Sequence, residues 1–193
     1  ISGIAVTGVT MTYGDKTAKI GISELREGDV ITYKKDGEGE EFKKNADLWA
    51  LDCGEYGYYV RIDRGDNYNP YTSRKVIVTI NKATVTATVT PDDDKLYYGD
   101  PLPSLTAKIG EETYKIESGE YELHLGMTSI TGSVANNIGK YNIENVDISV
   151  LREKYSEKNY NIALTTEGTI KINEAKLTVT VMLDKTELTY GEA

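Results

Sequence analysis

The segment ATVTATV at residues 83–89 alternates apolar residues with threonine over seven positions. Alternation with a period of two predicts a β-strand with one face buried and the other face in water. Threonine suits such a strand because its branched Cβ fits the pleated backbone. The segment AKLTVTV at residues 175–181 repeats the alternation in the same phase. The two segments therefore predict a protein that is built from β-strands.

These two segments belong to an internal repeat. The offset of 92 residues between them also aligns INKA at 80–83 with INEA at 172–175, and NYN at 67–69 with NYN at 159–161. A unit of this length is a whole domain, because solenoid units span only ~20–50 residues.

A shorter offset of 85 residues applies nearer the start of the chain. It aligns YGD at 13–15 with YGD at 98–100, and Gly54 with Gly139. The seven extra residues of the later copy must lie between Tyr141 and Asn159. A single insertion with both flanks in register is typical of a surface loop that differs between two copies of one fold.

The repeats predict the domain organisation. We expect an all-β chain of two tandem Ig-like β-sandwich domains, 1–81 and 82–173, and the first strand of a third, truncated repeat in 174–193. The chain is interpreted as a piece of a longer protein. No Pro-rich or Gly-rich linker separates the runs 76–80 and 84–90, which predicts a stiff junction.

Turn residues divide the rest of the chain into short segments. Further strands are expected at 29–34, 56–62, 75–80, 113–116, 121–125, 141–146, 160–164 and 169–172, and short helices only at 43–51 and 150–156. The strand at 175–181 has no domain of its own, so we expect it to pair with a neighbouring chain or to lie along the preceding domain.

Composition excludes several classes of function. The chain has 193 residues with a formal net charge of −9, which disfavours binding to nucleic acid and to anionic membranes. One Cys and one His cannot form a His/Cys zinc site within one chain, and no apolar run approaches the ~18 residues of a membrane span. No cofactor, metal or catalytic residue is expected, and the chain is interpreted as not being an enzyme.

An ordered set of motifs carries a family resemblance. It comprises the strand 83–89, YYGDPLP at 97–103, GKYNI at 139–143, NYNI at 159–162 and GTIKINEA at 168–175. This order resembles the MBG (mostly β, glycine-rich) repeat of bacterial surface proteins. The segment 1–81 lacks the Pro-x-Pro motif and resembles a divergent bacterial Ig-like relative. The resemblance implies a secreted, cell-wall or cell-surface location, tandem arrays and a β-sandwich without a catalytic site.

Two sets of residues are candidates for contact with a ligand. Arg64, Gly65 and Asp66 form the integrin tripeptide in a loop between two predicted strands. Tyr58, Tyr59, Tyr68 and Tyr71 form the densest tyrosine cluster, and tyrosine is enriched at interfaces. Each set also has a structural interpretation. The tripeptide can be an ordinary turn whose sequence matches by chance, and the tyrosines can be strand residues that pack in a core.

Three further segments are weighed in the same way. The acidic run 91–94 could hold Ca²⁺, but it lacks the spacing of a calcium loop and is interpreted as a solvated loop. Trp49 lies beside Leu48 and Leu51 and is expected in the core rather than stacked against a sugar. Lys82 with Asn161 or Asn173 could form an intramolecular isopeptide bond. That bond requires a buried lysine, and it is disfavoured because Lys82 lies at the junction between the two expected domains.

These observations favour a stalk or spacer in adhesion or presentation, whose partners are adjacent repeats of the same polypeptide. The first alternative is a module that binds a glycan or a host matrix protein. The second is an accessory domain of a surface enzyme.

Overall fold

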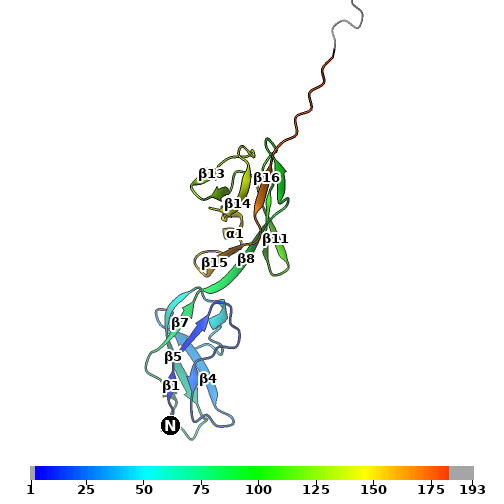
Figure 1. Cartoon of the computed structure of the whole chain (residues 1–193). Coiled ribbons are helices and arrows are strands. Elements are labelled where there is room, and N and C mark those ends of the chain that lie inside the picture. The colour runs from blue at the N-terminus through cyan, green and yellow to red at the C-terminus, as the bar shows by residue number, and fades with distance from the viewer. Residues whose placement is uncertain (1–2, 183–193) are drawn as a thin grey trace, which may run out of the picture. The chain divides into compact units, whose positions relative to one another are not determined.

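The computed structural model describes residues 3–182 and is nearly all β (Figure 1). The strands of the first part are β1 (Val6–Thr7), β2 (Val9–Thr12), β3 (Gly21–Ile22), β4 (Val30–Lys35), β5 (Gly54–Asp63), β6 (Tyr71–Thr72) and β7 (Val76–Asn81), with a 3₁₀-helix at Leu48–Ala50. They are followed by β8 (Ala83–Pro91), β9 (Lys95–Tyr97), β10 (Leu105–Ile109), β11 (Glu112–Ile116), β12 (Glu122–Leu125), β13 (Thr128–Ile130), β14 (Gly139–Glu144), α1 (Ser149–Arg152), β15 (Tyr160–Thr166) and β16 (Ile170–Asn173).

The secondary structure confirms most of the sequence predictions. Every further strand expected from the turn pattern overlaps an observed strand, and 83–89 lies within β8. The two short helices overlap the 3₁₀-helix and α1. The all-β, sandwich-type fold class is thus the observed one.

The strands form four sheets. Their orders are β1-β3, β2-β7-β5-β4 with β6 beside β5, β11-β10-β8-β15, and β13-β12-β14-β16-β9. The orders β2-β7-β5-β4 and β9-β16-β14-β12-β13 are two versions of one arrangement. We call them the first sheet and the second sheet.

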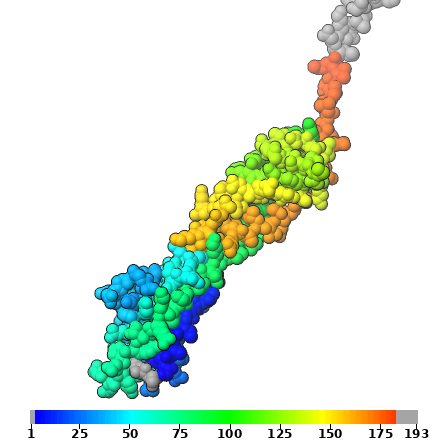
Figure 2. Space-filling view, turned by 90° about the vertical axis from the view of Figure 1, so that its left-hand side faces the viewer, coloured from blue at the N-terminus to red at the C-terminus, as the bar shows by residue number. Residues whose placement is uncertain are grey.

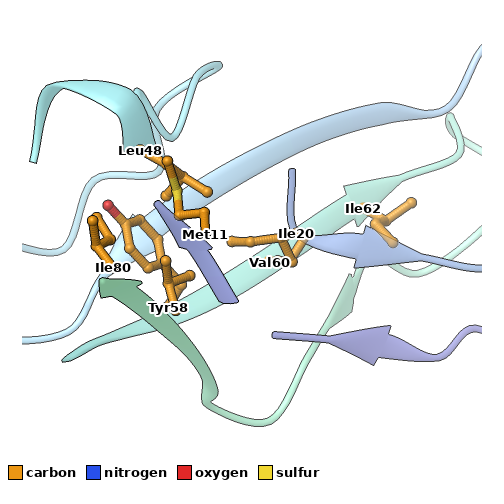
Figure 3. Packing of buried hydrophobic residues seen from close by; sticks show 8 residues of the cluster. Met11, Ile20, Leu48, Tyr58, Val60, Ile62 and Ile80 are labelled. Carbon is orange, nitrogen blue, oxygen red and sulfur yellow. The ribbon is translucent and has the colours of Figure 1, made fainter. Parts of the chain in front are cut away.

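The first sheet buries alternate side chains of its strands. Tyr58, Val60 and Ile62 of β5 pack with Val78 and Ile80 of β7. Met11 of β2 belongs to the same sheet and the same core, and Ile20 and Leu48 add to this core from outside the sheet (Figure 3). Full burial of one such side chain contributes about 1.5–3 kcal/mol relative to exposure.

The registers of the two sheets follow the offsets of the sequence repeat. The parallel pair β2–β7 places Thr12 opposite Asn81, and the parallel pair β9–β16 places Tyr97 opposite Asn173. Position 12 maps onto 97 by the offset of 85, and position 81 maps onto 173 by the offset of 92. The repeated residues therefore specify the same pairing in both sheets.

The antiparallel pairs agree with this mapping. Gly54 lies opposite Ile80 in the first sheet, and Gly139 lies opposite Ile172 in the second. The seven extra residues of the later copy fall in the segment between β14 and β15, which contains α1. The prediction of one surface insertion matches that segment.

Contacts divide the described residues into two compact units. One holds 3–89, Ala107–Tyr114 and Ile148–Thr165, and the other holds Thr90–Thr106, Lys115–Asp147 and 166–182. The domain boundaries inferred from the repeats stay a prediction.

The expected strand at 175–181 is absent. Residues 174–182 have no regular secondary structure, and Leu177 and Val181 are 89% and 81% exposed. In the space-filling view this orange-to-red segment leaves the rest of its own unit (Figure 2). The prediction of a first strand that lies along the preceding domain is wrong for these residues. Alternation favours a strand, but a strand forms only where another strand accepts its backbone hydrogen bonds. The remainder of the expected third repeat, 183–193, lies outside the described residues.

Candidate functional site

The arginine of the integrin tripeptide is bound within the protein. Arg64 Nε lies 2.7 Å from Asp29 Oδ1, and Arg64 Nη2 lies 2.8 Å from Asp29 Oδ2 and 3.0 Å from the Glu24 carbonyl oxygen. The Arg64 and Asp29 side chains are only 8% and 2% exposed. The Arg64 guanidinium lowers the pKa of Asp29 to about 2. Because the Arg64 side chain is nearly covered and its guanidinium already binds Asp29 and Glu24, little of it faces an external partner, and the structure does not favour Arg64 as a contact residue.

The other two residues of the tripeptide form the turn. The Gly65 amide donates to Asp63 Oδ1 over 3.0 Å, and Gly65 has a φ of 89°, which glycine adopts without strain. Asp66 is exposed beside it. The tripeptide therefore forms a compact loop whose first side chain points into a buried ion pair.

The adjacent tyrosines of the cluster, Tyr58 and Tyr59, point to different faces of the first sheet, because successive side chains of a strand alternate between the two faces. Tyr58 is 3% exposed, and its hydroxyl donates to the Ala46 carbonyl oxygen over 3.3 Å. Burial raises the pKa of Tyr58 to about 12. This residue belongs to the core, which corrects its prediction as a ligand contact.

The remaining tyrosines do not share one surface role. Tyr59 points to the opposite face from Tyr58, with Lys34 Nζ 5.4 Å from its ring centre. Tyr71 is partly buried against the core, and Tyr68 is 46% exposed in the loop before it. Tyr59 and Tyr68 stay predicted contact residues.

A surface cavity was missed by the sequence analysis. It has a volume of about 390 Å³ and lies between the segment 16–20 and the segment 44–49, with Tyr33 of β4 also in its lining. Trp49 forms part of its lining and is 48% exposed, so the prediction of Trp49 as a core residue is wrong. Its neighbour Leu48 takes the buried position, at 5% exposure (Figure 3). Adjacent residues of a 3₁₀-helix point to different faces, so lying beside Leu48 and Leu51 in sequence does not place Trp49 in the core with them.

Three lysines line this cavity, namely Lys16, Lys19 and Lys44. Lys16 Nζ lies 5.3 Å from the centre of the Trp49 ring, a distance at which the ring quadrupole attracts the ammonium group. Asp47 is the single acidic residue in the lining, so the cavity carries local positive charge in a chain of net charge −9.

A second cluster surrounds Asn159, which is only 7% exposed. Asn159 Nδ2 donates to Asp52 Oδ1 over 2.7 Å, and the Cys53 amide donates to Asn159 Oδ1 over 2.9 Å. The Asn159 carbonyl oxygen accepts from the Ala83 amide over 3.0 Å. Asn159 thus binds the turn before β5 and the start of β8 at the same time.

Charge and ring contacts extend this cluster. Lys158 Nζ lies 2.5 Å from Asp52 Oδ2, and the pKa of Asp52 is lowered by its bonds to Asn159 and Lys158. The Tyr160 ring meets the rings of Tyr13 and Tyr155 edge to face, each at 5.3 Å between centres. Edge-to-face contact is the favourable arrangement of two aromatic rings.

Cys53 at this cluster is a structural thiol. Its Sγ lies 3.7 Å from the Asn159 carbonyl oxygen, and burial raises the pKa of the thiol. A raised pKa lowers the thiolate fraction, and the thiolate is the reactive form. Cys53 is therefore poorly suited to nucleophilic chemistry.

Carboxylates of the acidic run 91–94 accept hydrogen bonds from nearby groups of the protein. Asp92 Oδ1 accepts from the Thr106 hydroxyl over 2.7 Å, and Asp93 Oδ1 accepts from the Lys95 amide over 2.9 Å. Within residues 3–182, no three His, Cys, Asp or Glu side chains are grouped so as to hold a metal ion. No helix of the described part of the chain is long and apolar enough to cross a membrane.

The comparisons with known proteins give little further information. No protein-family model and no curated protein matches the chain. A search of solved structures finds a surface glycan-binding protein (SGBP-B) from the mixed-linkage glucan utilization locus of Bacteroides ovatus, in complex with a mixed-linkage heptasaccharide. The match has 12% sequence identity and a TM-score of 0.27, and it covers 90% of this chain and 44% of that chain. The chain therefore spans less than half the length of this neighbour.

Proposed function

We propose that the chain is a non-catalytic spacer segment of a bacterial surface protein, built from MBG-like β domains in series. The observation that carries the proposal is the junction at Asn159. Strand β7 ends at Asn81 and β8 begins at Ala83, so one residue, Lys82, connects them. A spacer needs such a connection, because a flexible linker would let the next module diffuse rather than hold it in place.

The Asn159 cluster restrains this connection by side-chain contacts. A buried amide that satisfies both its donor and its acceptor on a neighbouring turn fixes the geometry of that turn, since each lost bond leaves a buried polar group unpaired. The Asp52–Lys158 ion pair and the Tyr13–Tyr160 ring contact act in the same direction. The contribution of the ion pair is small because both of its side chains are exposed.

The sequence offers a matched pair of variants to test this proposal. Asn159→Ala removes the buried amide, and Asn161→Ala removes the same side chain two residues along β15, where it is exposed. Backbone ¹⁵N relaxation of the whole chain reports whether residues of the first sheet and of the second sheet tumble with one correlation time. We expect one correlation time for the unmodified chain and for Asn161→Ala, and two shorter ones for Asn159→Ala. Separate tumbling in the unmodified chain would overturn the proposal.

Glycan binding by the tyrosine cluster is not the preferred function, since Tyr58 is buried and Tyr71 is partly buried. An extracellular, cell-surface location is part of the proposal, and it is tested by protease accessibility on intact cells of the source bacterium.

A further inference from the structure

We propose that the cavity beside Trp49 is a binding site for a carboxylated saccharide, that is, a chain containing uronic acid units. The proposed site consists of Trp49, Lys16, Lys19, Lys44 and Asn45, and we call it the Trp49 site. It goes beyond a spacer function because it gives the first part of the chain a ligand.

Exposure of the tryptophan is the first observation. Trp49 is the single tryptophan of the chain, and nearly half of its surface faces water although buried positions lie directly beside it. A large exposed ring in a cavity presents a flat apolar surface at low entropic cost, because the side chain has only two rotatable bonds. The C–H face of a pyranose ring is a complementary apolar surface of similar size.

Fixation of the backbone is the second observation. Asp47 has φ 43° and ψ 43°, a left-handed conformation that is uncommon outside glycine but that aspartate tolerates better than most residues. The Ala50 amide donates to the Asp47 carbonyl oxygen over 3.0 Å, and Leu48 anchors the turn in the core. The turn therefore holds Trp49 in place before any ligand arrives, which lowers the cost of binding.

Charge is the third observation. None of the ion pairs among the described residues uses Lys16, Lys19 or Lys44. By contrast, the adjacent Lys43 pairs with Glu38. Three lysines against one aspartate in the lining give the cavity local positive charge that attracts an anion, and a carboxylate on a sugar ring places the anion at the edge of the stacked surface. The volume of about 390 Å³ falls in the range of small-molecule sites and accommodates one or two sugar rings.

The second copy of the fold provides an internal control. At the offset of 85, Lys16, Lys19 and Trp49 fall on Pro101, Ser104 and Val134. Pro101 and Val134 form an isolated β-bridge, so the equivalent positions are adjacent in both copies. The scaffold is shared, whereas the ring and the charges occur only in the first copy. A difference confined to exposed side chains on a common scaffold points to binding rather than to folding.

Titration with tetragalacturonate, a linear chain of four uronic acid units, tests the proposal on the whole chain. Trp49 fluorescence reports on the site directly, because no other tryptophan contributes. We expect a saturable change with tetragalacturonate and none with its methyl ester, which has the same rings and linkages without the charge. Equal binding of the methyl ester, or equal competition by inorganic sulfate, would overturn the assignment of a carboxylated sugar.

Two matched pairs of variants locate the binding. Lys44→Gln is expected to weaken binding by about fivefold, and the triple variant with Lys16→Gln and Lys19→Gln by tenfold or more, whereas Lys43→Gln changes it less than twofold. Trp49→Ala is expected to abolish the binding heat in calorimetry, and Tyr98→Ala, which removes another half-exposed ring, to leave it unchanged. Unaltered circular dichroism shows that each variant is folded. Unchanged affinity of folded Trp49→Ala would overturn the proposal.

Discussion

The first and second sheets share one strand topology but differ in how completely equivalent side chains are buried. In the second sheet Tyr141 is fully buried, whereas Tyr56, at the equivalent position of the first sheet, is only partly buried. The repeated residues thus preserve strand pairing in both sheets, whereas the burial of equivalent side chains differs between them.

The two sheets also differ in their loops. The segment after β5 begins with Arg64, which pairs with Asp29 from the loop before β4, and the segment after β14 contains the inserted helix α1. Loops tolerate such changes because they carry few of the buried contacts on which the sheets depend. The two copies therefore share their strand pairing and differ in the side chains of their loops.

The largest expected effect tests the difference in burial. Tyr141→Ala should destabilise the second sheet by about 3–5 kcal/mol, as for other large aromatic side chains removed from a core. Tyr56→Ala should cost only about 1–2 kcal/mol, since the lost contacts are partly solvated and one hydroxyl bond to the Asp52 carbonyl oxygen disappears. Hydrogen exchange followed separately in peptides of each sheet measures both values. Equal losses would show that the two layers bury these rings alike.

A second prediction concerns the equivalent glycines that begin β5 and β14. A Cβ at Gly139 would lie 2.8 Å from Leu125 Cδ2, whereas a Cβ at Gly54 would meet nothing closer than 3.7 Å. Both glycines have positive φ, 156° and 150°, so alanine is strained at either site. We expect Gly139→Ala to cost about 2–3 kcal/mol and Gly54→Ala about 1 kcal/mol. Urea unfolding measures the loss in the free energy of unfolding for each variant. A larger loss for Gly54→Ala than for Gly139→Ala would contradict the prediction.

Acid stability distinguishes the buried ion pair of the first sheet. The folded pKa of Asp29 is about 2, below its ordinary value of 3.8, because Arg64 stabilises the carboxylate. The stabilisation is complete above the unfolded pKa and is lost as the pH falls from about 4 to about 2. Asp29→Asn should therefore lower the melting temperature at pH 7 and reduce its change between pH 4 and pH 2.

The control for this experiment lies in the second sheet. Hydrogen bonds from Asn145 and His124 lower the pKa of Glu122. Glu122→Gln should leave the acid response of the first sheet unchanged. An identical acid profile for Asp29→Asn and the unmodified chain would show that the Arg64 pair is not the source of the response.

The smallest expected effect concerns the integrin tripeptide. Asp66→Glu should change neither stability nor the attachment of integrin-bearing cells, because Arg64 is already bound to Asp29. Attachment of cells to immobilised protein measures this, with a fibronectin fragment as the positive control. Loss of attachment in the variant would restore the tripeptide as a contact site.

Sequence patterns predicted the repeated strand pairing well because both the alternation and the repeat offsets can be read from the order of the residues alone. The alternation in 83–89 specified β8, and the offsets of 85 and 92 specified two sheets of equal register. The candidate sites were predicted less well. Tyr58 and Arg64 looked like surface residues, and Trp49 looked like a core residue, since neighbours in sequence do not reveal what covers a side chain.

The sequence by itself determined which residues alternate, where turns fall and which strands are copies of one another, because periodicity and glycine placement act over a few residues. Tertiary structure decided the rest. It paired Arg64 with Asp29 across 35 positions, brought Asn159 to Asp52, and left 174–182 without a strand partner. The physical reason is that burial and hydrogen bonding depend on groups brought together across the fold, and a one-dimensional pattern contains only one side of each such contact.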